Sequence, residues 1–181
     1  MSTENVELLR EWYERLNAVG RTEPGAIDPE EIFPGIWDRV AEDAEFHERP
    51  EMPDATVYRG REEAMRFFRK TWEIFAELRW EPQEFIDCDD AVVVVTRVVG
   101  VGRGSDVPVE MDETDVIWFR DGMIVRVKGF PTREQGLAAG GRRRSLCLAF
   151  ARSSWPVRRG LRRRGSPARG RLRSCLPRVN G

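Results

Sequence analysis

Two stretches decide the fold of this chain, YRGREEAMRFF at residues 58–68 and RDGMIVRVK at residues 120–128. The first predicts an extended arm, a break at Gly60 and an amphipathic helix, because its apolar side chains recur at three- and four-residue steps. The second predicts a β-hairpin, because Asp121-Gly122 suits a tight turn between two apolar strands. A domain that combines long helices with hairpin-linked strands belongs to the α+β class.

Further elements extend outward from these two stretches. Apolar residues at helical spacing predict helices over residues 4–19 and 61–77, and Asp28-Pro29 marks the start of another. Thr132 and Gln135 have the spacing of a capping box and open a short final helix. Strands are predicted at residues 43–48, 79–87, 91–101, 107–119 and 123–130. The unbroken apolar run at residues 91–95 indicates a strand that is covered on both faces.

In this order, the elements resemble the SnoaL-like branch of the nuclear transport factor 2-like superfamily. The resemblance implies a cone-shaped, curved and mostly antiparallel sheet of about five strands, wrapped around three helices and enclosing a pocket. It also implies a homodimer that pairs through the outer sheet face, where Trp118 is expected. It does not fix a reaction, because this fold hosts isomerases, dehydratases, cyclases, epoxide hydrolases and binding modules without catalysis.

Charge divides the chain into two segments. Residues 1–140 form the predicted SnoaL-like domain, and all 31 acidic residues lie in it with 17 of the 30 basic ones. The Arg-rich tail, residues 141–181, has 13 Arg and no acid. Three interpretations of the tail stay open: a disordered segment, an extension read out of frame, or an arm that binds polyanions. The acidic domain argues against nucleic acid as its partner, so nucleic acid is expected only as a non-specific ligand of the tail.

Cofactor and compartment signals are few. His47 is the only histidine, and the three cysteines have no metal-ligand spacing, so neither a metal nor another cofactor is expected. No signal peptide or membrane span is visible, and the few cysteines fit a reducing compartment. The sequence therefore predicts a cytoplasmic protein without a membrane partner.

Two carboxylates are the first candidates for chemistry. Glu48 ends a predicted strand on the face of Phe46, and Asp115 stands inside an apolar strand, where a charge is costly unless it is paired or neutralised. Ketosteroid isomerases belong to the same superfamily, and alignment with them lays their base on Glu48 and their protonated aspartic acid on Asp115. Their tyrosine falls on Trp12, with Tyr13 next to it. Glu48 is therefore the expected base, and Asp115 the expected proton donor.

Arg97 is the third candidate for catalysis, because it interrupts an apolar strand and could pair with Glu113 or Asp115 inside the cone. An exposed Arg on the open sheet face is the alternative. The expected ligand is a small apolar organic molecule, and the ligand-binding candidates are Trp12, Phe46, Tyr58, Phe68, Trp72, Met111, Glu113 and Phe130. Two functions follow: an isomerase, lyase or hydrolase that uses carboxylate acid–base chemistry, or a non-catalytic dimeric module that binds a ligand or a protein.

Overall fold

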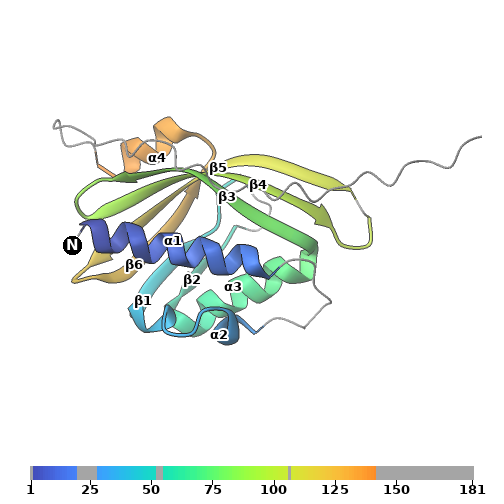
Figure 1. Ribbon diagram of the computed structural model, residues 1–181, viewed down its shortest axis with the longest axis horizontal. Helices are drawn as coiled ribbons and strands as arrows, with labels where there is room; N and C mark the ends of the chain where they lie inside the picture. Colours follow the sequence, from blue (N-terminus) through green and yellow to red (C-terminus); the bar gives the residue numbers. More distant parts are fainter. Residues whose placement is uncertain (1, 20–27, 52–54, 106, 142–181) are drawn as a thin grey trace, which may run out of the picture.

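The computed structural model describes residues 2–19, 28–51, 55–105 and 107–141. Its centre is a curved, unclosed six-stranded sheet with helices on both faces (Figure 1). The α+β prediction is confirmed. The Arg-rich tail lies outside the described residues, apart from Gly141.

Six strands form the sheet in the order β2-β1-β6-β5-β4-β3, and only the β1–β6 pair is parallel. The strands are β1 (Val40–His47), β2 (Val57–Arg59), β3 (Phe75–Asp87), β4 (Ala91–Gly102), β5 (Pro108–Arg120) and β6 (Met123–Phe130). The short edge strand β2 is the stretch that the sequence predicted only as an extended arm. Asp121 and Gly122 have positive φ values of 54° and 76°, as a tight hairpin turn requires.

Helices α1 (Ser2–Ala18), α2 (Pro29–Ile32) and α3 (Gly60–Ile74) lie on one side of the sheet, and α4 (Arg133–Ala139) lies on the other (Figure 1). A 3-10 turn, η1 (Trp37–Arg39), leads into β1. Asp28 caps α2 and Thr132 caps α4, each by accepting a backbone N–H, as the sequence predicts.

The sheet separates two apolar cores. The larger core lies under α1 and α3, and the smaller one lies under α4. Successive β4 side chains point to opposite faces, so Val92 and Val94 enter the larger core and Val93 enters the smaller one. All three are fully buried, which confirms a strand covered on both faces.

Helix α3 passes directly into β3, without a loop. The predicted helix of residues 61–77 therefore ends three residues too late. Arg103 fixes this corner, because its guanidinium donates to the carbonyl oxygens of Trp72 at 2.8 Å and Phe75 at 2.9 Å. Trp72 belongs to the last turn of α3, where carbonyl groups lack intrahelical partners, and Phe75 is the C-cap residue that begins β3. Within the described ranges, no helix has the length and apolarity needed to cross a membrane.

Candidate functional site

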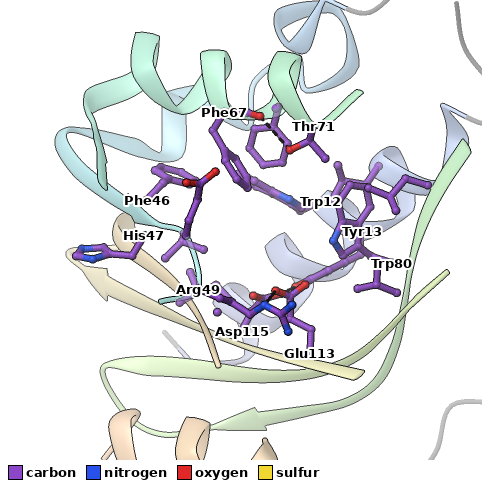
Figure 2. Close-up of a pocket in the computed structure, with 18 of the residues that line it drawn as sticks. Trp12, Tyr13, Phe46, His47, Arg49, Phe67, Thr71, Trp80, Glu113 and Asp115 are labelled. Carbon is purple, nitrogen blue, oxygen red and sulfur yellow. Dashed lines mark hydrogen bonds and ion pairs between the residues drawn. The ribbon is translucent and has the colours of Figure 1, made fainter. Parts of the chain in front are cut away.

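The concave side of the sheet and helices α1 and α3 enclose a cavity of about 430 Å³. Its wall is mostly apolar. Trp12, Phe46 and Phe67 lie along one part of it, and polar side chains gather at another (Figure 2). Such a cavity, apolar with a few convergent polar groups, is typical of a small-molecule site.

Three residues make the centre of the polar part. Glu113 and Asp115 are two residues apart on β5, so both point to the concave face. The Tyr13 hydroxyl donates to Asp115 Oδ2 at 2.7 Å. Tyr13 is buried on α1, and Asn17 one turn later holds that helix to β3 by two hydrogen bonds with the Trp80 backbone. The helix therefore fixes the hydroxyl over the strand.

Arg49 completes the group, which is called the polar floor below and consists of Tyr13, Arg49, Glu113 and Asp115 (Figure 2). Arg49 follows β1, and its Nε lies 3.6 Å from Glu113 Oε1. Gly129 on β6, opposite Asp115 in register, makes room for this contact. A Cβ at Gly129 would lie 2.8 Å from Arg49 Cγ and 2.9 Å from Glu113 Oε1, closer than atoms pack.

Burial in the cavity wall shifts the pKa values of the titratable floor residues. Both carboxyl groups keep some surface open to the cavity, but the surrounding protein removes most of their water. Desolvation, followed by the charge of Asp115, raises the pKa of Glu113 to about 8. Desolvation raises the pKa of Asp115 to about 6, against the lowering effects of the Tyr13 hydrogen bond and the Arg49 charge. Burial, followed by the charge of Asp115, raises the pKa of Tyr13 well above its ordinary value. At neutral pH the pair therefore holds one proton, and the hydrogen bond from Tyr13 favours the negative charge on Asp115.

A second polar group, called the rim cluster below, consists of Glu48, Tyr58 and Lys70. Glu48 Oε2 accepts the Thr56 backbone N–H at 2.9 Å, and its Oε1 accepts from the Tyr58 hydroxyl at 3.3 Å and from Lys70 at 3.5 Å. The Lys70 side chain is 49% exposed. Interaction with Tyr58, followed by the charge of Glu48, raises the pKa of Lys70. Glu48, the base that the sequence predicts, therefore accepts three hydrogen bonds from its neighbours.

The structure brings most of the predicted residues to the cavity. Its wall includes two of the three catalytic candidates and five of the eight ligand-binding candidates: Glu48, Asp115, Trp12, Phe46, Phe68, Met111 and Glu113. Tyr58 and Trp72 are buried in the core and are not among the lining residues. The Tyr58 hydroxyl donates a hydrogen bond to Glu48, which lines the cavity.

Two predicted placements are wrong. Arg97 lies on the outer sheet face, half exposed, as its alternative interpretation predicts, and it pairs with Glu110 rather than with Glu113 or Asp115. Strand alternation causes this, because Thr96 and Val98 take the inward positions beside it. Phe130 also points outward, into the small core under α4.

Two residues of the floor were missed. The tyrosine hydroxyl comes from Tyr13, one position after the aligned Trp12. Both face inward, with exposed fractions of 5% and 7%, so helical periodicity does not separate them. Arg49 stands beyond the end of a strand, where alternation assigns no face. Glu113 could be predicted because it lies two residues before Asp115 in the same strand, and this spacing places both carboxyl groups on one face.

The His47 ring points away from the cavity (Figure 2) and contacts Glu45 at 2.8 Å. Over the described parts of the chain, no three metal-ligating side chains converge. The carboxyl groups and the hydroxyl of the floor can form hydrogen bonds and exchange protons.

Comparison with known proteins agrees with this architecture. The family model of the SnoaL-like domain matches residues 9–127. A search of curated proteins found no match. The chain is similar to a solved NTF2-like protein of unknown function from Burkholderia pseudomallei, at 20% identity and a TM-score of 0.57, over 73% of this chain and 93% of that one.

Two further solved structures carry functional descriptions. A candidate SnoaL-like polyketide cyclase from Jannaschia is 20% identical, with a TM-score of 0.56 over 71% of this chain and 85% of that one. A protein with a ketosteroid isomerase-like fold from Catenulispora acidiphila, in complex with trimethylamine, is 14% identical, with a TM-score of 0.56 over 75% and 92%. At these identities, the likeness establishes the fold.

Proposed function

The chain belongs to the SnoaL-like domain family, and on that premise we propose that it binds a small, mainly apolar organic molecule and transfers protons on it. The observation that carries this proposal is the polar floor: two carboxyl groups and a tyrosine hydroxyl in a mostly apolar cavity. A general acid or base works best when its pKa lies near the working pH, and desolvation raises the pKa values of Glu113 and Asp115 to about 8 and about 6.

The two carboxyl groups have complementary roles. Ionised Asp115, held by the Tyr13 hydroxyl, removes a proton from the carbon next to a carbonyl group of the substrate. Protonated Glu113 gives its proton to the carbonyl oxygen, so an enol forms and the pair as a whole keeps one proton. Return of a proton to a different carbon isomerises the substrate, and attack of the enol carbon on a second carbonyl closes a ring. Isomerisation and cyclisation are thus the reaction classes that fit the floor.

Proton exchange into a simple ketone tests the proposal. The full-length chain is incubated with 2-acetylnaphthalene in deuterated buffer, and deuterium entry at the methyl carbon is followed by NMR. We expect Glu113→Gln and Asp115→Asn each to slow the catalysed exchange by about 10²- to 10⁴-fold. Arg97→Gln on the outer face is the matched control and keeps the wild-type rate. Glu48→Gln separates the roles of the two carboxylate sites, because a base at Glu48 requires a loss of the same size there.

The alternative is a non-catalytic module, and the same experiment identifies it. The ketone could quench tryptophan fluorescence without any deuterium entry above the buffer rate. That result would support ligand binding and contradict acid–base catalysis. Trp12 and Trp80 line the cavity and serve as reporters.

We also propose that the domain ends near residue 140 and that two copies pair through the outer sheet face in the cytoplasm. Trp118 lies partly exposed on that face beside Arg126, whose guanidinium is 5.9 Å from the ring centre. A large aromatic side chain open to solvent suits a protein interface. Light scattering on wild type and Trp118→Lys tests the pairing, with a shift from dimer to monomer as the expected result.

A further inference from the structure

Arg49 has more hydrogen-bonding capacity than its neighbours use. A guanidinium carries five N–H donors. Among the described residues, Arg49 is seen to donate to Met111 Sδ at 3.3 Å and to form one ion pair, at 3.6 Å from Glu113. A thioether is a weak acceptor, and 3.6 Å is longer than an N–H···O hydrogen bond.

The position of Arg49 makes this capacity available to a ligand. Its side chain is 17% exposed and lines the cavity, with the guanidinium beside the two carboxyl groups (Figure 2). Gly129 lets the Arg49 stem pass close to β6, because a Cβ at this position would lie 2.8 Å from Arg49 Cγ. A largely enclosed cation with unused donors gains free energy when an acceptor reaches it, and charge-assisted hydrogen bonds are about twice as strong as neutral ones.

We propose that the ligand carries a carboxylate, which the Arg49 guanidinium binds, and that the apolar body of the ligand lies among Trp12, Phe67 and Phe68. This inference rests on the proposed function, since it names the ligand class of the same cavity. Arg49 becomes the specificity-determining residue. Its fork of donors matches the two oxygens of a carboxylate, which a lysine ammonium cannot do.

The ionisation of Glu113, which lies beside Arg49, makes carboxylate binding dependent on pH. The charged and titratable groups that face Glu113 are Asp115 on its own strand, Arg49 beyond β1 and Tyr13 on α1 through Asp115. Once Glu113 ionises, two negative carboxylates compete for Arg49. The affinity for an acid then falls by about tenfold for each pH unit, whereas the affinity for a neutral ligand of the same shape stays constant.

Two probes with one ring system test the proposal on the full-length chain: 2-naphthoate and its neutral analogue 2-acetylnaphthalene, titrated by tryptophan fluorescence at pH 6.5. We expect the wild type to bind the acid at least tenfold more tightly than the ketone. Arg49→Met abolishes this preference and keeps ketone binding, and Arg49→Lys retains a part of it. Lys70→Met removes the other cation of the cavity wall and leaves the preference intact. Glu113→Gln keeps a donor that cannot ionise, so acid binding no longer falls above pH 8.

Equal binding of the two probes by the wild type, or a preference that Lys70→Met removes and Arg49→Met does not, overturns the assignment to Arg49. In both cases the ketone still binds, so the proposed small-molecule function survives. If neither probe binds, the proposed function fails, and the inference fails with it.

Discussion

The polar floor and the rim cluster contain the same chemical types, yet they differ in what they can do. Each has a tyrosine, a carboxylate and a cation: Tyr13, Asp115 and Arg49 in one, and Tyr58, Glu48 and Lys70 in the other. Lys70 is half exposed, so water screens its interaction with Glu48. Tyr13 is buried, and desolvation raises the pKa values of the floor carboxyl groups towards neutrality. The environment of a charged group, more than its identity, therefore selects it for proton transfer.

Unfolding as a function of pH should separate the two clusters most strongly. Because desolvation raises the pKa of Glu113 above its unfolded value, the folded state binds the extra proton. The contribution of this group to stability is fully present below about pH 4.5 and is lost as pH rises to about 8. The loss is about 1.4 kcal/mol per pH unit and up to about 5 kcal/mol in total. Urea unfolding of wild type and Glu113→Gln across this range measures the difference, and Glu48→Gln is the matched control. If the free energy of unfolding varied with pH in the same way for wild type and Glu113→Gln, Glu113 would have no raised pKa, and the proposed difference between the floor and the rim would be wrong.

Removal of each cation should give the next largest contrast. Arg49→Met leaves the floor carboxyl groups without their cation, and we expect the free energy of unfolding to fall by about 3 kcal/mol. The loss is no larger because the carboxyl pair can take up a proton and so reduce its unpaired charge. Lys70→Met breaks an exposed ion pair and should cost less than about 1 kcal/mol. Urea midpoints at pH 7.5 give both values. Equal costs would mean that the floor is as well solvated as the rim.

Gly129→Ala tests the packing that sets the floor geometry. The added methyl group meets Arg49 Cγ and Glu113 Oε1 at under 3 Å, and such overpacking costs about 2 kcal/mol. The cost should be smaller in an Arg49→Ala background, where half of the clash is absent. A double-mutant cycle reports this coupling, and strictly additive costs would show that Gly129 does not act through Arg49.

The two tyrosines should give the smallest contrast. Tyr13→Phe removes a 2.7 Å hydrogen bond and should cost about 1.5 kcal/mol, whereas Tyr58→Phe removes a longer, 3.3 Å bond to Glu48 and should cost about 0.5 kcal/mol. Without the Tyr13 hydroxyl, the pKa of Asp115 should rise further, because that hydrogen bond lowers it. Thermal unfolding and a pH titration of the Asp115 carboxyl group check the two effects. A greater loss from Tyr58→Phe would reverse the proposed order.

Much of the fold could be predicted because its signals are local. The Asp121-Gly122 turn, the Thr132 cap and the two-sided apolar run of β4 each depend on residues that are close in sequence. The sixth strand, β2, was missed because three residues are too few to establish an alternating pattern. The end of α3 was placed too late because the helix continues into β3, where Arg103, about thirty residues later, closes it.

The site was harder to predict because it depends on which side chain meets which across the sheet. Alternation placed Glu113 and Asp115 on one face, but the face of Arg97 required the register of β4 relative to β5. Trp12 and Tyr13 both face inward, and only the packing of α1 on β3 decides that the Tyr13 hydroxyl reaches Asp115. Arg49 lies where no periodic pattern applies.

The most direct measurement is an NMR titration of the Glu113 and Asp115 carboxyl carbons in the wild-type protein, assigned with Glu113→Gln and Asp115→Asn. We predict that Glu113 titrates at about pH 8 and Asp115 at about pH 6, so that the pair holds one proton at neutral pH. Titration of both carboxyl groups below pH 5 would contradict the proposal that the floor, rather than the rim, is the site of acid–base chemistry.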